Sequence, residues 1–122
     1  MAHIVAIIED DDFLRSLAVN KLEKAGYVVA MAGNGEDGLK LVQEKKPELL
    51  ILDLMLPGMS GFDVLASVRK DASLASLKVI VFSNLGDEAD MKKCQALGIQ
   101  DYLVKANFTL DELVQKIGTL LG

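Results

Sequence analysis

The sequence contains a single cysteine, Cys94, and a single histidine, His3. One cysteine cannot form a disulfide within the chain, and a lone thiol fits a reducing compartment. One cysteine and one histidine are also too few for a zinc cluster built from Cys and His ligands. Disulfide scaffolds and Cys/His zinc modules are therefore excluded.

Basic patches and long apolar runs are missing as well. The net charge is -5, and the pairs Lys45-Lys46 and Lys92-Lys93 are interpreted as solvated helix faces, so an electrostatic grip on nucleic acid or anionic lipid is not expected. The apolar run at residues 4–8 is too short for a secretion signal, and nothing approaches a membrane span. We therefore expect a cytoplasmic protein that contacts neither nucleic acid nor membrane directly.

Short apolar runs alternate with segments whose apolar residues recur at helical spacing. Residues 3–8, 27–32, 49–53, 78–83 and 101–104 are predicted strands, and a helix follows each of them. The 122 residues, 51% of them hydrophobic, suit one domain with a single core. Five such units predict a flavodoxin-like, doubly wound (βα)5 α/β sandwich of three layers, with a five-stranded parallel sheet of strand order 2-1-3-4-5. A barrel would need eight strands.

Turn and cap residues mark the predicted helix boundaries. The apolar positions of the first helix are Leu14, Leu17, Ala18, Leu22 and Ala25, and Gly26 ends it. The predicted N-caps of later helices are Ser60 and Asp87, and Thr109 with Glu112 forms a capping box before the last helix.

One carboxylate, Asp53, interrupts the most apolar stretch of the chain, residues 49–61. An ionised Asp in such a stretch is costly unless it is paired, hydrogen-bonded or at the end of an element. Pro57, Gly58 and Gly61 predict a sharp turn, so the strand should end near Asp53. Ligands of open α/β sheets bind at the carboxyl ends of the strands. Asp53 therefore lies where chemistry is expected.

The same edge of the sheet should collect the polar residues that follow the other strands: the acidic run at residues 9–12, Ser83, Asn84 and Lys105. Clustered carboxylates repel unless a cation is present, and Mg²⁺ suits one or two carboxylates, waters and a phosphate. The competing interpretation of residues 9–12 is a solvated helix start, where acidic side chains favour the positive end of the dipole. Asp53 shifts the balance toward a cation site.

Four motifs occur in a fixed order along the chain. They are Glu9-Asp10-Asp11 after a hydrophobic strand, Asp53-Leu54-x-Leu56-Pro57-x-Met59-x-Gly61, Ser83 after an apolar strand, and Gly98-x-x-Asp101-Tyr102-Leu103-x-Lys105. Together, on a chain of this length, they resemble the receiver domain of bacterial two-component response regulators. The resemblance implies one receiver domain over residues 1–122, with no output domain, that works as a signalling switch and not as a turnover enzyme.

The resemblance also implies roles for individual residues. Asp53 would be the phosphoacceptor, taking a phosphoryl group from a histidine kinase or a histidine phosphotransfer protein. Glu9 and Asp10 would hold Mg²⁺ directly or through water, with Asp53 and the main-chain carbonyl of Met55 as further ligands.

Ser83 and Lys105 would contact the phosphoryl oxygens, and Ser83 with Tyr102 would form the conformational switch. By the same analogy, the last two helices and the fifth strand would dock a downstream protein, and the chain would be a monomer or a weak, phosphorylation-dependent dimer.

Three positions depart from the family pattern. Ala106 follows Lys105 where many receivers have proline with a cis bond, and because a cis bond to a non-proline residue costs about 3 kcal/mol, we expect a trans bond and a more mobile loop. Met55 and Leu85 are apolar where the family often has residues that position a hydrolytic water. We therefore predict slow self-dephosphorylation.

Other classes remain as alternatives. A flavodoxin would want a phosphate-binding loop where this chain has the acidic run 9–12, and a hydrolase with an Asp nucleophile would want a second acid where Met55 stands. A receiver-like interaction module that never accepts phosphate is the remaining alternative. Ala106 favours that module, and the presence of all the landmark residues weighs against it.

Overall fold

Five short strands alternate with five helices within residues 2–121, the part of the chain that the computed structural model describes. The strands form one parallel sheet in the order β2-β1-β3-β4-β5, which confirms the predicted flavodoxin-like arrangement. They are β1 (Ile4–Ile8), β2 (Val28–Ala32), β3 (Leu49–Leu52), β4 (Lys78–Ser83) and β5 (Asp101–Val104). Each lies within one residue of its predicted range.

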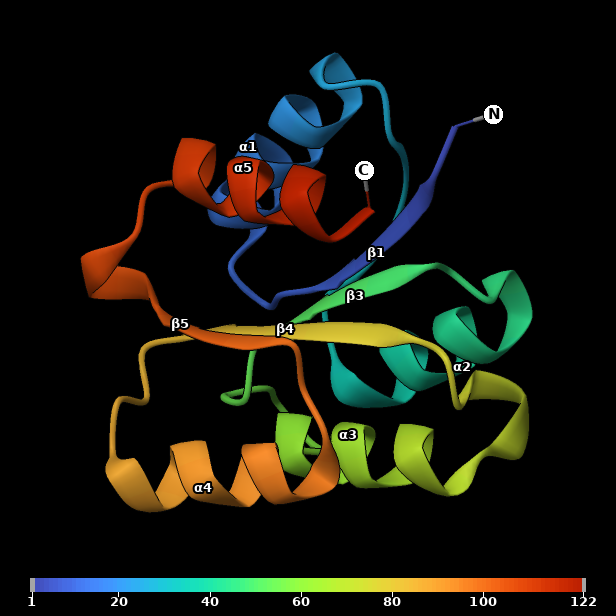
Figure 1. Cartoon of the computed structure of the whole chain (residues 1–122), viewed down its shortest axis with the longest axis vertical. Coiled ribbons are helices and arrows are strands. Elements are labelled where there is room, and N and C mark those ends of the chain that lie inside the picture. The colour runs from blue at the N-terminus through green and yellow to red at the C-terminus, as the bar shows by residue number, and fades with distance from the viewer. Residues whose placement is uncertain (1, 122) are drawn as a thin grey trace.

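The helices form a layer on each face of the sheet (Figure 1). Two helices, α1 (Asp12–Lys24) and α5 (Leu110–Leu121), cover one face. The other face is covered by α2 (Gly35–Lys45), α3 (Gly61–Lys70) and α4 (Glu88–Leu97). Right-handed crossovers between parallel strands produce this distribution. Two short 3-10 turns, Ala72–Leu74 and Lys105–Asn107, were not predicted.

The central strands are buried on both faces, and their side chains alternate between two cores. In β3, Leu50 and Leu52 pack toward α2, α3 and α4, whereas Leu49 and Ile51 pack toward α1 and α5. This two-sided burial explains why β3 is an uninterrupted apolar run.

Two apolar positions of the first helix lie outside the core. Leu17 is 40% exposed and Ala25 is exposed, while Ala18 and Leu22 are buried. Only one side of an amphipathic helix faces the core, and helical spacing alone does not define how wide that side is. The spacing therefore predicted more buried residues than the helix has.

The predicted cap residues all occupy their predicted positions. Ser60 Oγ accepts from Asp63 N at 3.2 Å. Thr109 and Glu112 form the reciprocal capping box, with bonds of 2.9 and 3.1 Å. Asp87 is the N-cap of α4, as predicted, although its side chain makes no capping hydrogen bond. The first turn of α4 is exposed, where water can satisfy its N–H groups.

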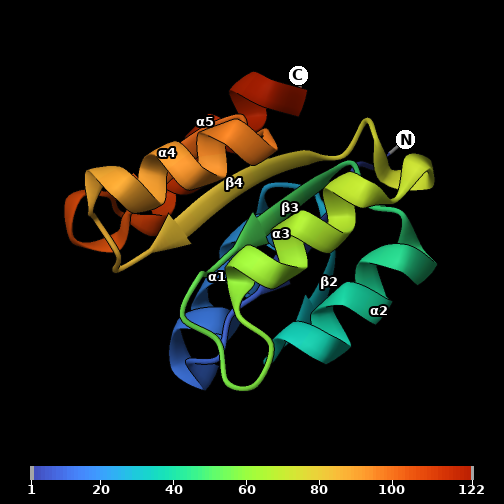
Figure 2. The same cartoon turned by 90° about the horizontal axis from the view of Figure 1, so that it is seen from below.

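All five strands run in the same direction, so the loops that follow β1, β3, β4 and β5 meet at one edge of the sheet (Figure 2). The candidate site lies at this edge. Across residues 2–121, no helix combines the length and apolar character that a bilayer crossing requires.

Candidate functional site

Asp53 lies directly after β3 and is only 4% exposed. Its main chain continues the sheet by one further bond, from Asp53 N to Ile8 O at 3.1 Å. Its Oδ1 accepts hydrogen bonds from Met55 N at 3.0 Å and from Ser83 Oγ at 2.8 Å. The buried carboxylate is therefore fixed at the end of the strand by two donors, one from its own loop and one from the end of β4.

Lys105, at the end of β5, supplies the positive charge of the site. Its Nζ lies 2.8 Å from Asp53 Oδ2 and 2.7 Å from Glu9 Oε1. Burial by itself would lower the pKa of Lys105, but its hydrogen bonds to Asp53 and Glu9 outweigh that effect and raise the pKa. Lys105 is therefore a charged bridge between two carboxylates.

The bond from Lys105 to Ala106 is trans, as predicted, because residues 2–121 contain no cis peptide. The amine nevertheless reaches both carboxylates, so the alanine does not shorten its reach. The greater mobility expected for this loop stays a prediction.

Glu9, Asp10 and Asp53 offer carboxylate oxygens that lie within 4.8 Å of one another. Glu9 is 3% exposed, and burial raises its pKa although Lys105 opposes the shift. Asp10 is exposed and leaves the cluster open to solvent on one side. Hard oxygen ligands with an open side are what Mg²⁺ requires, since this ion keeps several waters and adds phosphate oxygens. The donor set fits the ion.

The four acidic residues 9–12 fall into two groups, one in the predicted cation site and one at the start of α1. Glu9 and Asp10 belong to the carboxylate cluster. Asp11 is instead the N-cap of α1 and accepts from Leu14 N at 3.0 Å, and Asp12 pairs with Arg15 at 2.6 Å. The helix-start interpretation is therefore confirmed for Asp11 and Asp12, whereas Glu9 and Asp10 lie where a cation site is predicted, and that interpretation stays a prediction.

Arg15 is a residue of the site that sequence reasoning missed. Its Nη1 donates to the main-chain carbonyl of Glu9 at 2.8 Å, and its Nη2 donates to Asp12. The guanidinium thus holds the loop that carries Glu9 and Asp10. A basic residue one turn into a helix that follows an acidic run was the available signal.

Ser83 and Tyr102, the predicted switch pair, are linked through Leu85. Tyr102 Oη donates to Leu85 O at 2.6 Å, and Leu85 N donates to Ser83 Oγ at 3.4 Å. Burial raises the pKa of Tyr102 to about 12. Because Ser83 also donates to Asp53, hydrogen bonds connect the buried carboxylate to the half-buried tyrosine on β5. The apolar side chain of Met55, 53% exposed, and the half-buried Leu85 border this edge.

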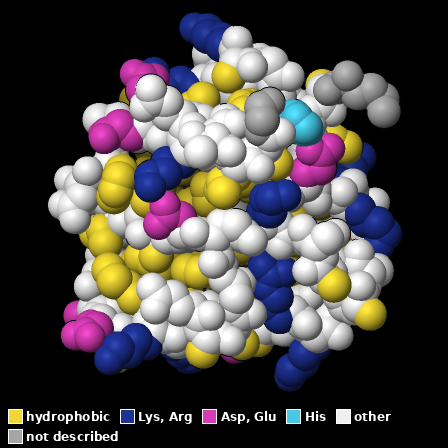
Figure 3. Space-filling model, in the orientation of Figure 1, with side chains coloured by type: hydrophobic (Ala, Val, Ile, Leu, Met, Phe, Trp, Pro, Cys, Tyr) yellow, Lys and Arg dark blue, Asp and Glu magenta, His cyan; other side chains and the backbone are white. Residues whose placement is uncertain are grey.

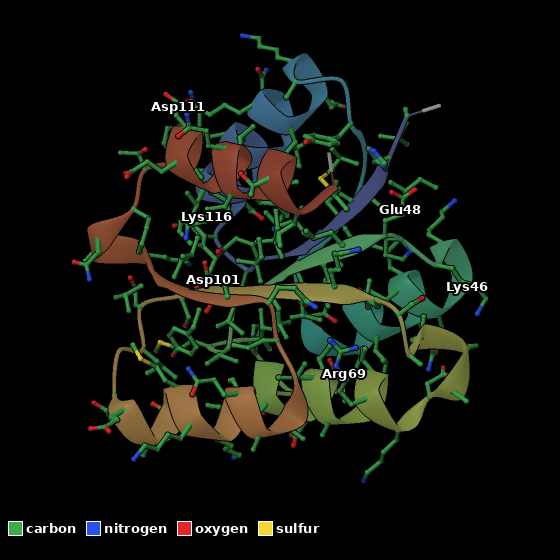
Figure 4. All side chains as sticks on the ribbon, in the orientation of Figure 1. Lys46, Glu48, Arg69, Asp101, Asp111 and Lys116 are labelled. Atoms are coloured by element: carbon green, nitrogen blue, oxygen red, sulfur yellow. The ribbon has the colours of Figure 1, made fainter. Side chains whose placement is uncertain are left out.

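The surface formed by α4, β5 and α5 contains a groove of about 490 Å³ between β5 and α5. Figure 3 shows hydrophobic side chains on this face between the two helices. Lys116 of α5 pairs with Asp101 of β5 at 2.8 Å across the groove (Figure 4). The groove is lined by Gln100, Asp101, Phe108, Glu112, Gln115, Lys116, Thr119 and Leu120.

Comparisons with known proteins agree on one family. Residues 5–118 match the family described as response regulator receiver domain. The transcriptional regulatory protein AfsQ1 of Streptomyces coelicolor is 40% identical over 81% of this chain, which covers 43% of AfsQ1. Protein PilH of Pseudomonas aeruginosa is 33% identical, with 86% of each chain covered.

A crystal structure of a LuxR-family DNA-binding response regulator from Staphylococcus aureus is also similar. It is 31% identical, has a TM-score of 0.88, and the match covers 97% of this chain and 98% of that one. The chain spans about half the length of most of the curated relatives it matches.

Proposed function

The chain belongs to the response regulator receiver domain family, a family of signalling switches in two-component systems, and from this premise we propose that Asp53 accepts a phosphoryl group from a histidine kinase or a histidine phosphotransfer protein. The observation that carries the proposal is the convergence of Ser83 and Lys105 on the two oxygens of the Asp53 carboxylate, at 2.8 Å each. A buried aspartate with a structural role would need donors as well, but it would gain nothing from two further acids at the same sheet edge, which repel it.

The proposed transfer uses the carboxylate as a nucleophile. An oxygen of Asp53 forms a bond to phosphorus while the bond from phosphorus to the imidazole nitrogen of the donor breaks, and the nitrogen keeps the electron pair and takes a proton from solvent. Asp53 is attacking as a carboxylate, so no base is needed. Lys105 and Ser83 would donate to the phosphoryl oxygens, where charge develops.

Glu9, Asp10 and Asp53 would hold Mg²⁺, and the main-chain carbonyl of Met55 would be a further ligand. When bound, the ion would neutralise charge on the transferring phosphoryl group. Lys105 bridges Glu9 and Asp53, so the fold itself supplies the two carboxylates with one countercharge.

The switch would run from Ser83 to Tyr102. A Ser83 hydroxyl that turns toward the phosphoryl group leaves space into which the ring of Tyr102 can move. The chain of hydrogen bonds through Leu85 supports this coupling, because a shift of Ser83 disturbs the carbonyl that Tyr102 binds. Tyr102 lies on β5, so its movement would alter the surface of α4, β5 and α5.

We propose that a downstream protein docks on that surface and that the domain itself does not bind nucleic acid. The groove between β5 and α5 supports the first statement, and the net charge of -5 supports the second. We expect either a monomer or a weak dimer that forms on phosphorylation. Light scattering with and without a phosphate analogue tests this expectation, and an unchanged monomer mass would contradict the dimer.

Intact mass after incubation with Mg²⁺ and acetyl phosphate tests the proposed function. We expect the wild-type chain to gain one phosphoryl group and the Asp53→Ala variant to gain none. Asp63→Ala, which removes an exposed carboxylate in the first turn of α3, is the matched control and should be labelled like the wild type. No gain under saturating donor would favour the alternative, a phosphorylation-independent interaction module.

A further inference from the structure

The loop between β3 and α3, residues 53–60, is held by a side chain from another element. Glu36, in the first turn of α2, accepts a hydrogen bond from Met59 N at 2.9 Å. The bond joins residues 23 positions apart in the sequence. Figure 2 shows the loop lying beside the beginning of α2.

The backbones at this contact are packed too closely for larger side chains. A Cβ atom on Gly35 would lie 2.2 Å from the carbonyl oxygen of Met59, and a Cβ on Gly58 would lie 2.9 Å from a carboxylate oxygen of Glu36. Gly58 also has a φ of +71°, which disfavours other residues. The close contact between α2 and the loop therefore requires a glycine on each side.

The other hydrogen bonds of the loop lie at its ends. Met55 N donates to the Asp53 carboxylate, and Gly61 N donates to Leu54 O at 3.0 Å. Among the hydrogen bonds of residues 2–121, the one to Glu36 is the only bond that ties the interior of this loop to a different part of the fold. Its loss would leave the loop between Met55 and Ser60 with no hydrogen bond to another element, held there only by the packing of Leu56 and Met59 against the core.

We propose that Glu36 is a positioning residue for the phosphorylation site: by holding Met59, it fixes the loop that carries the Met55 carbonyl and so strengthens Mg²⁺ binding. This inference rests on the proposed function. Partners that orient metal ligands from outside typically contribute 10- to 100-fold to metal affinity, so about 10-fold is expected for a residue that acts through the loop backbone.

A different role for Glu36 makes a different prediction. An acid in the first turn of a helix also interacts with the helix dipole, and that interaction depends on charge. The hydrogen bond to Met59 depends on reach. Glu36→Gln keeps the reach and removes the charge, whereas Glu36→Asp keeps the charge and shortens the reach by one methylene.

The test measures two quantities in the purified chain. The first is amide hydrogen exchange at Met59 without metal, by nuclear magnetic resonance; the second is the Mg²⁺ dissociation constant, by calorimetric titration with magnesium chloride alone. We expect Glu36→Ala and Glu36→Asp to speed Met59 exchange and to weaken Mg²⁺ binding about 10-fold. Glu36→Gln should retain both properties within about twofold of wild type, because its amide oxygen still accepts the bond. Glu44→Ala, an exposed acid at the other end of α2, is the control and should match wild type.

Two outcomes would overturn the inference. In the first, Glu36→Ala speeds Met59 exchange but leaves the Mg²⁺ affinity unchanged. In the second, Glu36→Gln binds Mg²⁺ as weakly as Glu36→Ala does, which would mean that the charge of Glu36 matters and its hydrogen bond does not. If Glu36→Ala fails to fold, the comparison of Glu36→Gln with Glu36→Asp still tests the inference. If the wild-type chain binds no Mg²⁺ and takes no phosphoryl group from acetyl phosphate, both the proposed function and this inference are wrong. If the wild type is labelled normally but the Glu36 variants bind Mg²⁺ as the wild type does, only this inference is wrong.

Discussion

Lys105 Nζ and Glu9 Oε1 form an ion pair of 2.7 Å between two side chains that are 13% and 3% exposed. The same amine also contacts Asp53. Two carboxylates that would otherwise repel one another in a buried site thus share a single cation. The lysine is therefore important for the stability of the site as well as for its proposed chemistry.

Replacing Lys105 by Met should destabilise the fold. The two carboxylates lose their cation, and removing one member of a buried ion pair costs about 3 kcal/mol, at the low end of the usual range because the carboxyls can take up protons. Urea denaturation at neutral pH measures the loss, and added Mg²⁺ should recover part of it. Lys116→Met, which breaks the more exposed pair with Asp101, is the control and should cost under about 1 kcal/mol. Equal losses in the two variants would contradict the prediction.

Two glycine-to-alanine substitutions should change stability in opposite directions. A Cβ on Gly61 would lie 2.2 Å from the carbonyl oxygen of Asp53, so Gly61→Ala must displace the backbone of the site and should cost about 3 kcal/mol. Gly118 lies within α5, where a Cβ would lie no closer than 3.7 Å to the Tyr27 hydroxyl. Gly118→Ala should stabilise the fold by about 0.5–1 kcal/mol. Denaturation midpoints measure both, and a stabilised Gly61→Ala would show that the loop yields freely.

The proposed aspartyl phosphate should be long-lived. Met55 and Leu85 cannot hydrogen-bond an attacking water, and Met55→Asn introduces an amide that can. One new hydrogen bond of about 1 kcal/mol in the transition state corresponds to hydrolysis about fivefold faster. The decay of phosphoryl mass after removal of the donor gives the rate. Met31→Asn is the control, since Met31 is 55% exposed, close to the 53% of Met55, but lies on β2; fast decay in wild type, unaltered by Met55→Asn, would refute the idea.

Alkaline pH should weaken the fold through Tyr102. The pKa of this phenol is about 12 in the folded chain, above its ordinary value of 10.0, because burial disfavours the phenolate. The folded chain keeps a proton that the unfolded chain loses, so this contribution is complete below pH 10 and disappears as the pH rises to about 12. The free energy of unfolding should therefore fall more steeply with pH in wild type than in Tyr102→Phe. In a Tyr27→Phe background, an absorbance titration midpoint near the ordinary value would contradict the assignment.

The fold was predictable because its signals are local. Buried parallel strands are apolar runs such as residues 49–52, and Ser60, Thr109 and Glu112 mark helix starts by short-range hydrogen bonds. The gathering of Glu9, Asp53, Ser83 and Lys105 also followed, because parallel strands bring their carboxyl ends to one edge. The roles assigned to these residues stay predictions.

Contacts between distant segments were not predictable from local patterns. Glu36 binds the amide of Met59, 23 residues away in the sequence. This bond depends on how closely the start of α2 approaches the loop, and neither a motif nor the periodicity of apolar residues predicts that distance. The exposure of Leu17 has a similar cause, since it depends on how far the contacts of α1 extend around the helix.

The order of the strands along the chain also determines when the site becomes complete during synthesis. Asp53 follows the central strand β3, whereas Lys105 follows the edge strand β5, 52 residues later. Until β5 has emerged and paired with β4, the growing chain holds the carboxylates of Glu9 and Asp53 without their lysine. The last strand to be made thus brings the cation, so a copy that stops short of residue 105 lacks both ion pairs of the site, those of Lys105 with Glu9 and with Asp53.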